Sequence, residues 1–130
     1  MKFMDVYLSR RALLEIEALR IITKQGQGIL NGHKRGQRFF VEHILQMGST
    51  LSASHEKLRR LKDLLRESFL GFFSFDSGET REQREWGPSY MGKVFLEIES
   101  RPGSKPRFRA FVIDFDGTFK LRPVKVRQEG

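Results

Sequence analysis

Apolar and polar residues follow two different periods along this chain, and the two periods predict helices and strands. After Ser9 and again after Ser54, apolar residues return every three or four positions, which is the spacing of one helical face. Ser9 has a side chain suited to capping the first helix. The expected elements are helices Ser9–Lys24 and Ser54–Ser68 and strands Gly28–His33, Arg38–Gln46, Phe69–Phe75, Lys93–Glu99, Arg107–Asp114 and Phe119–Val126.

Two local patterns add to this prediction. Phe69–Phe75 is apolar at nearly every position, which is typical of a strand that is covered on both faces. Asp116 and Gly117 predict a tight turn between the last two strands. The order of elements predicts an α/β domain, a mixed sheet flanked by helices.

Length and composition narrow the class of protein. A chain of 130 residues suits one packed domain, so we expect a single domain over residues 1–130 with its core between about residues 9 and 126. The sequence contains no cysteine, which excludes disulfides and thiolate zinc sites. Apolar runs stay shorter than the roughly 20 residues of a membrane span, and the first residues lack the apolar core of a signal peptide. We therefore expect a cytoplasmic protein that does not associate with membranes.

Positive charge is in excess along the chain. The 24 lysines and arginines outnumber the 16 aspartates and glutamates, for a formal net charge of +8. This excess favours an acidic partner such as nucleic acid, although dispersed cations also occur on surfaces that are merely well solvated. The nucleic-acid hypothesis predicts that cations of neighbouring strands gather on one face. The candidates are Arg107, Arg109, Lys120, Arg122 and Lys125.

Several stretches occur in the order that is found in a known family. They are Gly28–Gly32 (GILNG), Gly71–Ser77 (GFFSFDS), Ser89–Gly92 (SYMG) and Phe108–Asp114 (FRAFVID). Together they resemble the JAB/MPN (JAMM) metalloprotease family over most of the chain. The resemblance implies a cytidine-deaminase-like α/β fold, with a mixed β-sheet between the two predicted helices.

The resemblance also implies which residues occupy the catalytic positions. In active members a glutamate is the general base, two histidines and an aspartate bind zinc, and a serine polarises the intermediate. The matching positions hold Gln25 for the base, Ser74, Asp76 and Gly92 for the zinc ligands, and Ser89 for the serine. Glutamine cannot accept a proton at neutral pH, and serine and glycine are poor zinc ligands. We therefore expect no enzymatic activity, no bound metal and no cofactor.

A member of this family without its catalytic residues implies a protein-binding or scaffold module. The resemblance implies a partner such as a ubiquitin-like protein or another JAB/MPN domain, and it leaves a homo-oligomer open. Trp86 has two interpretations, as a core residue or as an anchor that binds a partner. The predicted contact surface is a vestigial groove formed by Gln25, Ser74, Asp76, Trp86, Ser89 and Gly92.

Two further patterns have competing interpretations. Asp114–Thr118 (DFDGT) matches the nucleophile motif of haloacid dehalogenase-like phosphatases, but a β-hairpin with Asp-Gly at its turn explains the same residues. The three histidines, His33, His43 and His55, are expected at separate positions rather than together at a metal.

The segment after Phe75 is rich in acidic residues. One interpretation is a hydrolase with a rewired metal site, in which Asp76 and its acidic neighbours bind a hard cation. Alternatively, the interleaved arginines make this segment a self-neutralised surface loop. The residues concerned are Asp76, Glu79, Glu82, Glu85, Arg81 and Arg84.

Overall fold

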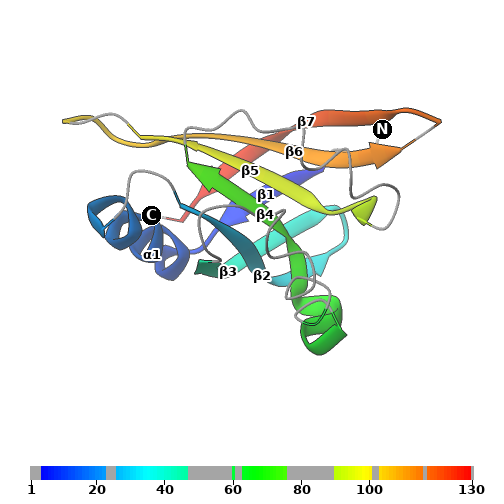
Figure 1. Cartoon of the computed structure of the whole chain (residues 1–130), viewed down its shortest axis with the longest axis horizontal. Coiled ribbons are helices and arrows are strands. Elements are labelled where there is room, and N and C mark those ends of the chain that lie inside the picture. The colour runs from blue at the N-terminus through cyan, green and yellow to red at the C-terminus, as the bar shows by residue number, and fades with distance from the viewer. Residues whose placement is uncertain are drawn as a thin grey trace.

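The computed structural model of this chain describes residues 4–22, 26–46, 60, 63–75, 90–100, 103–115 and 117–129. Within these residues the chain forms seven strands, the helix α1 and a short 3₁₀ turn (Figure 1). In chain order they are β1 (Asp5–Leu8), α1 (Arg10–Ile22), β2 (Gln27–Arg35), β3 (Arg38–Gln46), η2 (Arg66–Ser68), β4 (Phe69–Phe75), β5 (Val94–Glu99), β6 (Arg107–Phe115) and β7 (Phe119–Gln128).

The seven strands close into a barrel in the order β1, β3, β2, β4, β5, β6, β7. Neighbouring strands are antiparallel except at three pairs, which are β4 with β5 and β1 with each of its two neighbours. In β1, Val6 lies opposite Phe39 of β3 on one side and Val126 of β7 on the other. β1 is therefore the strand that closes the barrel.

β7 changes its partner part-way along its length. Residues up to Val124 pair with β6, and residues from Lys125 onward pair with β1. The ribbon of β6 and β7 therefore extends beyond the start of β1, on the side of the barrel away from α1 (Figure 1). The change of partner leaves an open wedge on each side of β7, and each wedge holds a pocket.

Two apolar clusters stabilise the barrel. The larger cluster fills the interior with side chains such as Leu8 and Phe73, and α1 adds Ile16 and Leu19 to it. The smaller cluster lies on the other face of β4 and β5, around Phe72. Each large apolar side chain that is fully buried in these clusters stabilises the fold by about 1.5–3 kcal/mol.

β4 contributes side chains to both clusters, which confirms the prediction of a strand covered on both faces. All seven of its residues are buried. Phe73 faces the interior cluster and Phe72 faces the other. Gly71 directly precedes Phe72 in β4, and a Cβ at this position would collide with the carbonyl oxygen of Val94. Glycine is required here because β4 and β5 approach closely.

Most of the predicted elements are confirmed. Ser9 caps α1, since its Oγ accepts a hydrogen bond from the Ala12 amide at 3.1 Å. Ala12, Ile16 and Leu19 form the buried face of α1, whereas Ile21 and Ile22 at its end are exposed. β3 and β4 have the predicted bounds, and β6 and β7 form the predicted hairpin.

The predicted fold class is wrong. The sequence predicted a JAB/MPN-like α/β fold, a mixed sheet flanked by helices Ser9–Lys24 and Ser54–Ser68, whereas the described residues form a closed barrel that is mostly β-sheet. α1 matches the first helix. Of the second helix, Arg60 and residues 63–65 are helical, η2 follows, and the rest lies outside the described residues. The prediction did not include β1, whose four residues pair with β3 and β7 and close the sheet.

α1 has 13 residues and is the longest helix in the part of the chain that the structure describes. In that part, no helix combines the length and the apolar character that crossing a membrane requires. The cytoplasmic location stays a prediction.

Candidate functional site

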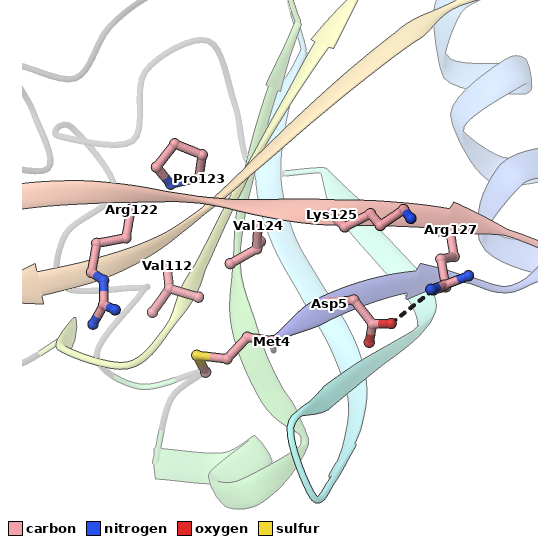
Figure 2. A pocket seen from close by; sticks show the side chains of 8 residues that line it. All are labelled: Met4, Asp5, Val112, Arg122, Pro123, Val124, Lys125 and Arg127. Carbon is pink, nitrogen blue, oxygen red and sulfur yellow. Dashed lines mark hydrogen bonds and ion pairs between the residues drawn. The ribbon is translucent and has the colours of Figure 1, made fainter. Parts of the chain in front are cut away.

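A pocket of about 510 Å³ lies in the wedge where β7 leaves β6 to pair with β1 (Figure 2). β1, β6, β7 and the residue before β1 form its walls. The described residues that line it are Met4, Asp5, Val112, Arg122, Pro123, Val124, Lys125 and Arg127. Three of these side chains are cationic and one is acidic, so the pocket is positively charged.

The three cations of the pocket all belong to β7. Arg122 makes a long ion pair of 3.5 Å with Asp114, and its side chain is 68% exposed. Arg127 donates to Asp5 at 2.9 Å and is 48% exposed. Lys125 is exposed, and among the described residues no carboxylate pairs with it. All three charges are therefore accessible to a ligand from solvent.

Asp5 is held between two arginines. Arg38 donates to its two carboxylate oxygens through Nε and Nη2, each at 2.9 Å, and Arg127 donates through Nε at 2.9 Å. The hydrogen bonds from Arg38, together with the one from Arg127, outweigh desolvation and lower the pKa of Asp5 below its usual value. The Asp5 carboxylate is therefore ionised and already neutralised by its partners. It does not cancel the charge of the other cations.

The pocket combines this charge with apolar side chains. Met4 and Val124 pack against the interior cluster, and Val112 belongs to it. In Figure 2, Arg122 and Val124 extend from β7 toward the same side as Val112 and Met4. Such a site suits a ligand with a negatively charged group and an adjoining apolar part. Within the described residues, no three histidine, aspartate or glutamate side chains gather where they could hold a metal ion.

A second pocket, of about 540 Å³, lies on the other side of β7. Its cations are Arg107 and Arg109, and two glutamates of β5, Glu97 and Glu99, also line it. Arg109 pairs with Glu97 at 2.7 Å. Positive and negative charges are balanced in this pocket, so it is a weaker candidate for binding an anion.

Four of the five cations that were predicted to gather on one face are divided between the two pockets, and Lys120 lines neither. Arg122 and Lys125 line the first pocket, and Lys120 lies two residues before Arg122 on β7. The two β6 arginines line the charge-balanced second pocket. The five cations therefore do not form one cluster. Arg122 and Lys125 line a common pocket, and the nucleic-acid hypothesis stays a prediction.

The structure describes only part of the predicted vestigial groove. Ser74 is buried in β4 opposite Glu97, whereas Gly92 is exposed just before β5. Because Gly71 pairs with Val94, Gly92 lies near the start of β4 and Ser74 near its end, about 16 Å apart along the strand. The structure does not bring these two residues together. The groove residues outside the described part of the chain are Gln25, Asp76, Trp86 and Ser89.

The other candidate sites are resolved in part. His33 contacts Glu42 and His43 pairs with Glu15, so these two histidines lie at separate positions, as predicted. Asp114 lies in a β-hairpin, which confirms the hairpin interpretation of the phosphatase-like motif. The residues that lie outside the described part of the chain are His55, Glu79, Glu82, Glu85, Arg81, Arg84 and Asp116.

The sequence-based prediction missed Asp5, which lines the pocket, and Arg38, which pairs with Asp5 from β3. A signal was present, because polar and apolar residues alternate over Asp5–Leu8 as they do in a strand with one buried face. Val6 and Leu8 are buried, so Asp5 and Tyr7 face outward. An alternation over only four residues is too short to distinguish a strand from a loop.

Comparison with known proteins identifies the fold and no family. No family model and no curated protein sequence matches this chain. Among solved structures, the chain is similar to the solution structure of protein DSY2949 from Desulfitobacterium hafniense, with a TM-score of 0.62 and 18% sequence identity. The similarity covers 95% of this chain and 94% of that chain. At this identity it supports the fold alone, and the JAB/MPN resemblance stays a prediction.

Proposed function

We propose that this protein is a noncatalytic nucleic-acid-binding domain whose β7–β1 pocket holds phosphates of the nucleic-acid backbone. One observation carries the proposal, which is the arrangement of charge around the pocket. Arg122, Lys125 and Arg127 line it, and its acidic residue, Asp5, already pairs with two arginines. The pocket therefore has positive charge that the described residues do not neutralise.

Phosphate is the anion that these side chains suit best. The arginine guanidinium presents a planar fork of N–H donors that matches phosphate oxygens, and Lys125 adds a point charge. Arg122 and Arg127 are five positions apart on β7, about 17 Å of strand. This length exceeds one phosphate and suits several phosphates along a chain. The formal net charge of +8 also favours a polyanion over a small anion.

Binding through these contacts should depend steeply on salt. Neutralising three phosphates would release counterions with a slope of log affinity against log salt of about −2 for a single strand and about −2.7 for a duplex. We expect Lys125→Ala to weaken binding several-fold and to reduce the magnitude of this slope by about 0.7–0.9.

Fluorescence anisotropy with mixed-sequence oligonucleotides, single-stranded and duplex, over about 50–200 mM salt measures both quantities. Lys105→Ala is the matched control. Lys105 is exposed in the turn before β6, and seven residues, about 23 Å of strand, separate it from Val112 of the pocket. The control removes the same charge and should leave affinity and slope nearly unchanged.

Two results would count against this function. One is that the wild-type protein binds neither oligonucleotide at the lowest salt. The other is that Lys105→Ala weakens binding as much as Lys125→Ala. The second result would mean that net charge, and not the pocket, attracts the ligand.

The hypothesis of a protein-binding scaffold stays a prediction. It was built on the vestigial groove, and four of the six groove residues lie outside the described part of the chain. The geometry of the described residues favours the nucleic-acid proposal instead.

A further inference from the structure

Three aromatic side chains form a row on the outside of the barrel. Tyr7 of β1 lies opposite Phe40 of β3, and Phe40 lies opposite His33 of β2. The ring centroids are 5.5 Å apart for Tyr7 and Phe40 and 4.9 Å apart for Phe40 and His33. The second pair is stacked, with an angle of 15° between the ring planes. We call Tyr7, Phe40 and His33 the aromatic row. It crosses three neighbouring strands.

The aromatic row does not belong to either apolar cluster of the described residues. On the same strands, Val6 and Phe39 point into the interior, so the residues that follow them point outward. Tyr7 and Phe40 are half-buried, and 49% of the His33 side chain is exposed. Rings that the core does not use, gathered at the surface, are typical of a ligand-contacting surface.

Arg38 joins the aromatic row to the pocket. Its guanidinium carbon lies 6.0 Å from the ring centroid of Tyr7 and 5.8 Å from that of Phe40. The same guanidinium pairs with Asp5, which pairs in turn with Arg127 of the pocket. β7, β1, β3 and β2 are consecutive in the barrel. The pocket and the aromatic row therefore lie on one surface, about 14 Å across at roughly 4.8 Å per strand.

From this continuity we infer that the ligand is a single-stranded nucleic acid, with phosphates in the β7–β1 pocket and bases against the aromatic row. The inference rests on the nucleic-acid function proposed above and specifies its substrate class. Proteins that bind single strands combine a basic surface along the backbone with aromatic side chains on which bases stack. This surface has both features side by side.

A duplex cannot use the surface in the same way. Its bases already stack on one another, so their faces are covered and only its phosphates can reach the protein. A single strand can place its phosphates in the pocket and extend the stack of aromatic rings with its bases. We therefore expect a preference for single strands that depends on the rings and not on charge.

The test compares wild-type protein with the double variant Tyr7→Leu/Phe40→Leu and with Lys125→Ala. Leucine keeps an apolar side chain and removes the aromatic face. The probes are labelled strands of about 12 nucleotides, as RNA and as DNA, and a duplex of the same sequence. Lys105→Ala is the charge control, and thermal melting verifies folding. If the double variant does not fold, His33→Leu tests the exposed end of the row.

We expect the double variant to lose roughly tenfold or more in affinity for single strands, since stacking contributes on the order of 1–3 kcal/mol per base. Its affinity for the duplex should stay within about twofold of wild type. Its slope of log affinity against log salt should be nearly unchanged. Lys125→Ala should weaken both single-strand and duplex binding. The RNA and DNA probes show which sugar the surface prefers.

Several outcomes would overturn the inference. Unchanged single-strand affinity in the double variant would show that bases do not stack on the row. An equal loss for single strands and duplex would indicate a general structural effect. Equal displacement by unlabelled polyglutamate or anionic phospholipid vesicles would indicate a nonspecific polyanion surface. Failure of wild type to bind any oligonucleotide would contradict the proposed function as well, whereas an effect of Lys125→Ala without an effect of the leucines would contradict this inference alone.

Discussion

At the scale of single residues, Asp5 organises the basic surface of the barrel. Its carboxylate accepts hydrogen bonds from Arg38, 33 residues away in sequence, and from Arg127, 122 residues away. Only 13% of its side chain is exposed. A charge-assisted, two-pronged contact of this kind is stronger than an ion pair on an open surface. Asp5 therefore both stabilises β1 in its place and fixes the direction of two arginines.

The lowered pKa of Asp5 predicts a loss of stability in acid. A folded-state pKa below the unfolded value of about 3.8 adds stability above that value, and the contribution disappears as pH falls through the folded-state pKa. We expect Asp5→Asn to lower the free energy of unfolding by about 1–2 kcal/mol at neutral pH. The difference from wild type should shrink below about pH 3.8.

Urea unfolding of wild type and Asp5→Asn at neutral pH and near pH 3 measures this difference. Asp63→Asn removes an exposed carboxylate and is the control, with little expected change at either pH. A difference between wild type and Asp5→Asn that is the same at both pH values would contradict the prediction.

At the scale of elements, α1 shows how one helix presents two different faces. Ile16 is 1% exposed and belongs to the interior cluster, whereas Ile21, five residues later, is 81% exposed. Residues five apart on a helix point in different directions, so the same residue type meets the core at one position and solvent at the other. The contribution of α1 to stability therefore comes from one narrow face.

The two isoleucines provide a matched pair for a stability measurement. Ile16→Ala should lower the free energy of unfolding by about 2–5 kcal/mol, because it leaves a cavity in the interior cluster. Ile21→Ala should change it by less than about 0.5 kcal/mol. Chemical unfolding followed by circular dichroism compares them. Equal effects of the two substitutions would mean that α1 does not pack on the barrel as described.

At the scale of the whole molecule, closure depends on its shortest strand. β1 has four residues and bonds in parallel to β3 on one side and β7 on the other. Without β1, β3 and β7 would each keep an unpaired edge, and the pocket and the aromatic row would not share a surface. The candidate function therefore depends on closure as much as the fold does.

Amide hydrogen exchange tests the closure. The Asp5 amide donates to the Gln37 carbonyl at 3.1 Å, on the β3 side. Successive strand amides point to opposite sides, so those of Val6 and Leu8 point toward β7. We expect these two amides to exchange as slowly as that of Tyr7, which points toward β3. Fast exchange at Val6 and Leu8 beside slow exchange at Tyr7 would show that β1 is an edge and that the sheet is open.

The local elements follow from the sequence alone, because burial on one face or on both produces a periodic pattern of apolar residues. The sequence predicted the cap at Ser9, the doubly covered β4 and the hairpin of β6 and β7, and all three are confirmed. It also excluded disulfides through the absence of cysteine. The cations of β7 could be identified from the sequence, because the charge of a lysine or arginine follows from the residue type alone.

Strand pairing, and with it the fold class and the site, becomes visible only in the folded barrel. Periodicity records which face of a segment is buried, but it does not record which distant segment covers that face. β1 joins two strands that are far apart in sequence, and Asp5 meets Arg38 and Arg127 only after the barrel closes. The pocket and the aromatic row exist because this closure places β7, β1, β3 and β2 side by side.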